Sequence, residues 1–178
     1  MAIESDEARL WPAVTVTRTI GATPGELWAA ISMPGNLELA HPFCDTNPVE
    51  VWPGIGARDE IHYLSGWVYR RECTGWIDGV GYDLSVGGAG EQPSHVAWRI
   101  ATDRSATGEA GASLTITIRP RSIDGIPKVA QRPVQFVYVR RQLRNYLESV
   151  VRGFDWYVTT GRPVSRNQFG RHRWFSER

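Results

Sequence analysis

A long amphipathic segment, residues 134–158, constrains the fold more than any other feature of the chain. Its apolar side chains recur every three or four residues, which places them on one face of an α-helix. Pro133 before the segment and Gly161 after it are typical of a helix start and stop. At 1.5 Å per residue such a helix would be about 37 Å long, enough to cross a small sheet. The apolar positions are Phe136, Val139, Leu143, Leu147, Val150, Phe154 and Tyr157.

The chain before this helix is predicted to contain one strand, two short helices and six further strands. Residues 14–20 alternate apolar and polar side chains, as a half-buried strand does. Residues 23–26 (TPGE) combine an N-cap threonine, a first-turn proline and a capping-box glutamate, so a short helix should follow and end at Pro34. A second short helix is predicted over residues 36–40. The six strands are predicted over residues 49–52, 58–63, 66–76, 81–86, 95–101 and 113–119, with a hairpin loop over 102–111 and a connector over 121–132.

Glycine or proline marks nearly every junction between these strands, as antiparallel hairpins require. The helices stand apart from the strands along the chain instead of alternating with them. The sequence therefore predicts an α+β fold with an antiparallel sheet.

Size and composition fit one domain that does not enter a membrane. The chain has 178 residues, of which 42% are hydrophobic, and this is ordinary for a globular protein. Because its start is acidic and no apolar run approaches the ~20 residues of a membrane span, we expect a cytoplasmic protein. The net charge of +1 gives no electrostatic reason to expect a nucleic-acid partner.

Neither a metal nor a cofactor is expected from the sequence. Cys44 and Cys73 read as reduced thiols, and His41 with Cys44 would leave a zinc ion short of its three or four ligands. The chain has no nucleophile elbow, phosphate-binding loop or dinucleotide fingerprint. We therefore expect no hydrolase, kinase or nicotinamide-dependent activity.

Three short motifs resemble the START/Bet v 1-like (SRPBCC) superfamily, in particular its polyketide cyclase/dehydrase and lipid-transport group. They are residues 20–28 (IGATPGELW), 34–36 (PGN) and 54–56 (GIG), and the resemblance covers residues 13–160. It implies a helix-grip fold, in which a seven-stranded antiparallel sheet wraps around the long C-terminal helix and two short helices follow the first strand. It also implies an enclosed, mostly apolar cavity. Members bind lipids, sterols, hormones or polyketides and some are enzymes, so the activity must be argued from residues.

Strand alternation predicts which side chains would line such a cavity. On the strand over residues 66–76, Trp67, Tyr69, Arg71 and Cys73 share one face, and this aromatic face is predicted to point inward. For each apolar candidate the alternative is an ordinary place in a filled core. The predicted ligand-binding residues are Trp67, Tyr69, Arg71, Trp98, Leu114, Ile116, Leu143, Leu147 and Phe154.

An inward Arg71 would carry a charge into an apolar space, which is costly without a partner. Glu60 or Asp59, one strand away, is the candidate partner in the empty protein, and an anionic ligand could share the guanidinium. The alternative is an arginine that reaches water.

His41 and Glu60 are the candidate catalytic residues. His41 opens the string HPFCD, which the resemblance places near the cavity mouth, and imidazole is an acid or base near neutral pH. Asp45 could orient it, and Cys44 could act as a nucleophile if its pKa were lowered. The competing interpretation is a structural histidine.

Two functions fit these predictions. The favoured one is binding of a small hydrophobic molecule, lipid-, polyketide- or aromatic-like, inside the cavity. The alternative is a cyclase- or dehydratase-type enzyme acting in the same pocket, with Arg71 or Tyr69 holding a substrate oxygen. A pure interaction module with a filled core is a third class.

Residues 1–160 are interpreted as the domain, and residues 161–178 as an extension that mixes arginines with aromatics. The extension is expected to dock its aromatics on the domain or on a partner subunit, and the second arrangement would give a homodimer. Binding to phosphates or anionic membranes is the competing interpretation.

Overall fold

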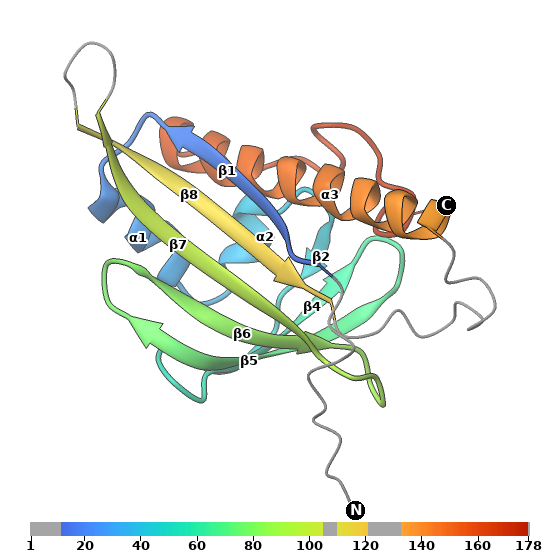
Figure 1. The fold of residues 1–178 in the computed structure, drawn as a ribbon. Coiled ribbons are helices and arrows are strands. Elements are labelled where there is room, and N and C mark those ends of the chain that lie inside the picture. The colour runs from blue at the N-terminus through green and yellow to red at the C-terminus, as the bar shows by residue number, and fades with distance from the viewer. Residues whose placement is uncertain (1–11, 105–109, 121–132, 178) are drawn as a thin grey trace, which may run out of the picture.

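The computed structural model describes residues 12–104, 110–120 and 133–177. The elements follow in the order β1 (Val14–Ile20), α1 (Pro24–Ser32), α2 (Asn36–Ala40), β2 (Cys44–Thr46), β3 (Val49–Val51), β4 (Arg58–Tyr63), β5 (Val68–Ile77), β6 (Gly81–Gly87), β7 (Ser94–Arg104), β8 (Ala110–Arg119) and α3 (Pro133–Thr160). Figure 1 shows α3 lying across one side of the sheet.

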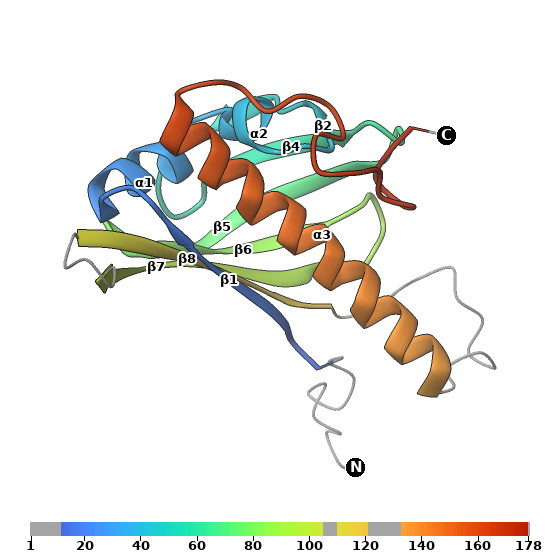
Figure 2. The ribbon, with the colours of Figure 1, turned by 90° about the horizontal axis from the view of Figure 1, so that it is seen from above.

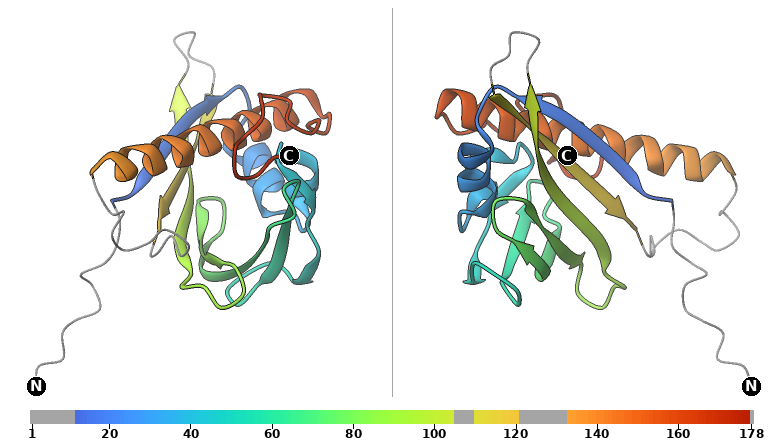
Figure 3. Two further views of the ribbon diagram at one scale, coloured as in Figure 1. Left: turned by 90° about the vertical axis from the view of Figure 1, so that its right-hand side faces the viewer. Right: turned by 60° about the vertical axis from the view of Figure 1, so that its left-hand side comes forward.

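All strand pairs are antiparallel, and the sheet runs in the order β1-β8-β7-β6-β5-β4-β2, with β3 also paired to β4. The sheet is strongly curved, and α3 crosses its open side while α1 and α2 cover one end (Figures 2 and 3). A curved antiparallel sheet with seven strands along its path, closed by a long helix, is the helix-grip arrangement. The predicted fold class is confirmed.

Helix α1 begins where its capping residues predict it. At the start of α1 the Thr23 hydroxyl accepts the backbone N–H of Glu26 at 3.2 Å, and the Glu26 carboxylate accepts the backbone N–H of Thr23 at 2.8 Å. This reciprocal capping box satisfies two amides that the helix leaves unpaired. The C-terminal end of α3 lies where Gly161 adopts a left-handed φ of 68° and donates its N–H to the carbonyl oxygen of Tyr157 at 2.9 Å.

The strand predictions differ from the structure at β2, β7 and β8, and by up to two residues at the ends of β3, β5 and β6. The short strand β2 was not predicted, because its three residues are too few to show alternation. Strands β7 and β8 extend into the predicted 102–111 loop, as far as Arg104 and from Ala110. The predicted connector over residues 121–132 lies outside the described residues.

One end of the space between sheet and helix is filled with aromatic rings. We call this the filled end, and it consists of Trp28 on α1 together with Trp52, Trp76, Tyr82, Trp98 and Phe154. Trp76 stacks on Tyr82 with ring centroids 5.4 Å apart, and Trp98 meets Phe154 edge to face at 5.1 Å. The Tyr82 hydroxyl donates to the backbone carbonyl of Ile31 on α1. This end of the molecule therefore packs as a solid core.

Candidate functional site: a cavity between the sheet and α3

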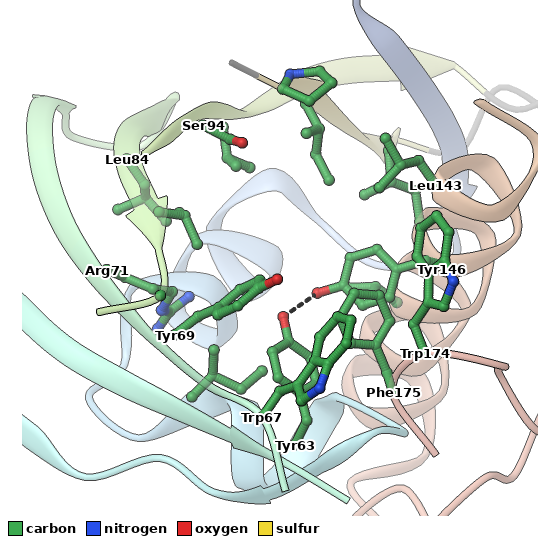
Figure 4. A pocket seen from close by; sticks show the side chains of 18 of the residues that line it. Tyr63, Trp67, Tyr69, Arg71, Leu84, Ser94, Leu143, Tyr146, Trp174 and Phe175 are labelled. Carbon is green, nitrogen blue, oxygen red and sulfur yellow. Dashed lines mark hydrogen bonds between the residues drawn. The ribbon is translucent and has the colours of Figure 1, made fainter. Parts of the chain in front are cut away.

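A cavity of about 750 Å³ occupies the other end, between the concave face of the sheet and residues 138–150 of α3 (Figure 4). Its walls are mostly aliphatic. Strands β6, β7 and β8 and helix α3 supply them with Leu84, Val86, Val96, Ile116, Ile118, Val139, Leu143, Leu147 and Val150.

Seven of the predicted ligand-binding residues line this cavity. They are Trp67, Tyr69, Arg71, Trp98, Ile116, Leu143 and Leu147. Leu114 and Phe154 do not line it; both are buried in the packed core. Trp67 is 46% exposed, so it sits at the rim and not deep inside.

Arg71 points inward, as the alternation on β5 predicts, and is 5% exposed. Its partner is Asp59, not Glu60: Arg71 Nε donates to Asp59 Oδ1 at 2.7 Å, and Arg71 Nη2 donates to Asp59 Oδ2. Burial alone would lower the pKa of Arg71, but the charge and hydrogen bonds of Asp59 outweigh it and raise the pKa. The guanidinium is therefore charged, and the Asp59 carboxylate compensates that positive charge through two hydrogen bonds.

Glu60 lies on the outer face of the sheet, so the prediction of a base or partner at this position in the cavity is wrong. Strand β4 alternates, with Asp59, Ile61 and Tyr63 buried and the residues between them partly exposed. The Glu60 carboxylate contacts His62 at 3.1 Å. Together these contacts and the strand alternation keep it away from any molecule in the cavity.

His41 does reach the cavity, where it begins a chain of polar groups. Its Nδ1 accepts the backbone N–H of Phe43 at 3.2 Å, and its Nε2 lies 3.0 Å from the hydroxyl of Tyr146 on α3. The Tyr146 hydroxyl is in turn 3.0 Å from that of Tyr63 on β4. Gly153 lets α3 lie close to the end of α2, because a Cβ at this position would lie 2.0 Å from the carbonyl oxygen of Ala40, the residue before His41.

Burial dominates the acid–base behaviour of this region. It lowers the pKa of His41 to about 3, assisted by the positive charge of Arg71, so the imidazole is neutral near pH 7. Burial raises the pKa of Tyr63 and Tyr146 well above the ordinary value, so both phenols keep their protons.

The neighbours of His41 in the string HPFCD do not take the predicted roles. Burial raises the pKa of the Cys44 thiol to about 12, which disfavours a thiolate nucleophile. Asp45 is exposed and forms an ion pair with Arg166, so it does not orient His41. The prediction that Asp45 supports the imidazole is wrong.

The extension docks on the domain of its own chain and forms part of the cavity wall. Its backbone N–H groups at Val164 and Asn167 donate to Leu39 and Pro42, each at 2.8 Å. Phe175 stacks on Tyr63 with centroids 4.4 Å apart, and Trp174 and Phe175 both line the cavity. Sequence reasoning expected docking but missed this wall, whose only sequence signal is the pair of adjacent aromatics.

Over residues 12–104, 110–120 and 133–177, no group of three or more His, Cys, Asp or Glu side chains is placed to hold a metal ion. In the same part of the chain, no helix combines the length and apolarity needed to cross a membrane.

No protein-family model and no curated protein matches this sequence. Solved structures do match its fold. TTHA0849 from Thermus thermophilus is 16% identical with a TM-score of 0.64, over 84% of this chain and 99% of that one. Ara h 8.0201 is 11% identical with a TM-score of 0.58, over 84% and 98%.

DynU16, a protein from the dynemicin biosynthetic locus, is 18% identical with a TM-score of 0.63 over 88% of this chain. This chain spans half the length of DynU16, since the match covers 50% of that chain. Together with the curved sheet and long helix, these likenesses show that the chain has a START/Bet v 1-like helix-grip fold.

Proposed function

We propose that this protein binds a small, mostly apolar molecule in the cavity under α3. The cavity itself carries this proposal: about 750 Å³ of space with largely aliphatic walls lies within the range of about 300–1,000 Å³ that is usual for small-molecule sites. Lipid-, polyketide- and aromatic-like molecules are the classes that such walls suit. The occurrence of DynU16 in a biosynthetic locus makes aromatic and polyketide-like molecules the first to test.

The polar groups of the cavity favour binding over catalysis. Both ring nitrogens of His41 are hydrogen-bonded, so neither offers a free lone pair to remove a proton from a substrate. The charge of Arg71 is already neutralised by Asp59, which leaves less of it for a developing oxyanion. A cyclase or dehydratase in the same pocket remains the alternative and would need one of these groups released.

Native mass spectrometry of the gently purified protein tests the proposal directly, because a bound lipid-like molecule would add to the mass. Titration with the neutral fluorescent probe N-phenyl-1-naphthylamine provides an independent measure. We expect a co-purified molecule or saturable probe binding, and the absence of both would contradict the proposal.

A cavity-filling variant shows where the probe binds. Leu143→Trp places an indole ring in the space and should weaken probe binding at least tenfold while the fold is kept. Val137→Trp is the matched control, because Val137 is 64% exposed on the same helix. Equal loss of binding in both variants would place the probe elsewhere.

A further inference from the structure

The paired hydroxyls of Tyr63 and Tyr146 hold more hydrogens than their protein partners accept. Each phenol carries one O–H hydrogen, and the two oxygens share a single hydrogen bond of 3.0 Å. That bond uses one of the two hydrogens. The second needs an acceptor, since a buried donor without one loses about 1–3 kcal/mol.

His41 cannot be that acceptor. Its Nδ1 already accepts the backbone N–H of Phe43, so in the neutral ring the hydrogen is on Nε2. Nε2–H therefore donates to the Tyr146 hydroxyl, which lies 3.0 Å away. The chain of hydrogen bonds has one direction, from Phe43 and His41 toward the two tyrosines.

The remaining hydrogen faces the cavity. Both tyrosines line it, and Figure 4 shows their hydroxyls meeting at its inner surface, with the Tyr69 hydroxyl pointing toward them. Among the described residues, neither hydroxyl has a further hydrogen-bond partner. The rings of Phe43 and Phe175, which stack on this pair of tyrosines, offer no acceptor oxygen.

Arg71 lines the same cavity, but Asp59 already neutralises it through two hydrogen bonds. An anionic ligand would therefore give up its hydration without meeting an uncompensated positive charge. An uncharged oxygen has a much smaller desolvation cost and suits the phenol donor equally well.

We propose that the Tyr63–Tyr146 pair donates a hydrogen bond to an uncharged acceptor oxygen of the ligand, a carbonyl or an ether. This inference rests on the proposed function, since it specifies the ligand that the cavity would take. It assigns to the tyrosine pair the anchoring role that the sequence suggested for Arg71.

Three probes with one skeleton test the chemistry: 2-acetylanthracene, 2-ethylanthracene and anthracene-2-carboxylate. The ketone should bind about fivefold more tightly than its ethyl analogue, the worth of one added hydrogen bond. The carboxylate should bind most weakly at pH 7. Equal affinity of ketone and ethyl compound, or tightest binding of the carboxylate, would overturn the inference and leave the proposed function standing.

Variants assign the donor. The double change Tyr63→Phe/Tyr146→Phe should remove the ketone preference, because a single change leaves the other hydroxyl able to donate. Tyr82→Phe is the matched control, since its hydroxyl bonds to Ile31 outside the cavity, and it should keep the preference. Loss of the preference in Tyr69→Phe alone would transfer the role to Tyr69.

The infrared carbonyl stretch of 2-acetylanthracene bound to the unmodified protein needs no variant. Its frequency should be lower than in hexane and close to the frequency in alcohol. A stretch equal to that in hexane would overturn the inference. If N-phenyl-1-naphthylamine binds but none of the three anthracenes does, the inference also fails; if no probe of any kind binds, the proposed function fails with it.

Discussion

The filled end and the cavity end of this molecule are built from the same strands and the same helix, yet one is solid and the other hollow. At the filled end, Tyr82 and Trp98 on β6 and β7 reach across to Trp28 and Phe154. At the cavity end, the same strands present Val86 and Val96, which are too short to span the space under α3. Cavity formation here depends on side-chain length at a few positions, because the backbone curvature is shared.

Aromatic rings also occur at the cavity end, but there they form the boundary. Tyr63, Tyr146 and Phe175 pack against one another, with centroids 4.5 Å apart for the last two, and do not project across the space. Hydrogen bonding of the two hydroxyls fixes the tyrosines in that position. Thus the rings fill one end and enclose the other.

The largest effect is expected at the boundary between the two ends. There the Arg71 Cζ lies 5.8 Å from the centroid of the Trp52 ring, and Arg71 also lines the cavity. Asp59→Asn should cost about 3–5 kcal/mol in unfolding free energy, because it leaves a buried charge unpaired. Urea denaturation measures this loss. Glu60→Gln, on the outer face, is the matched control and should cost less than about 0.5 kcal/mol; similar losses in the two variants would refute the pairing.

Matched leucine truncations test the comparison itself. Leu27→Ala in fully buried α1 packing should cost about 2–5 kcal/mol. Leu143→Ala should cost about 1 kcal/mol, since Leu143 is only partly buried and already borders empty space. Equal costs by chemical denaturation would mean that the cavity end is as well packed as the filled end.

Acid should destabilise the cavity end. The folded pKa of His41 is lowered to about 3 from 6.5, so between these values the unfolded chain binds a proton that the folded chain does not. The unfolding free energy should fall as pH decreases through this window, by about 2 kcal/mol between pH 6.5 and 5.

His41→Gln should show a weaker pH dependence over that range in urea titrations at several pH values. His172 shifts in the same direction through burial but is present in both proteins, so the difference between them reports His41. Parallel curves would show that His41 is not buried as a neutral ring.

The smallest effect separates stability from binding. Thr23→Ala removes the cap of α1 and should cost about 1 kcal/mol, whereas Thr23→Ser should be nearly neutral. Because α1 covers the filled end, the affinity for N-phenyl-1-naphthylamine should not change in either variant. A lower affinity in Thr23→Ala, measured where the protein remains folded, would show that the two ends are coupled.

Local signals made much of the fold predictable from sequence. The capping box marks the start of α1, Gly161 marks the end of α3, and residues 36–40 coincide with α2. The inward face of β4 could also be predicted, because the apolar residues Ile61 and Tyr63 lie on the same face as Asp59. Choosing Asp59 over Glu60 as the partner of Arg71 required only that alternation.

Other features depend on contacts that sequence patterns do not encode. The register of β5 against β6 shifts between Cys73 and Gly75, and this irregularity turns Trp76 inward, out of phase with Arg71. Tyr146 meets Tyr63 although the two are 83 positions apart in the chain, and Phe175 comes from a segment beyond the resemblance. The polar chain in the cavity therefore could not be assembled before the fold was known.

The docking of Trp174 and Phe175 also has a consequence for the order in which this protein is made. A ribosome releases the sheet and then α3 before it releases the segment that seals the cavity beside Tyr63. A nascent chain that has emerged from the ribosome as far as Thr160 holds the other walls but still exposes the two tyrosine rings to water. Capture of a ligand should consequently follow emergence of the sealing segment, and a ribosome-stalled chain whose residues 161–178 are still inside the exit tunnel should release N-phenyl-1-naphthylamine faster than the released chain does.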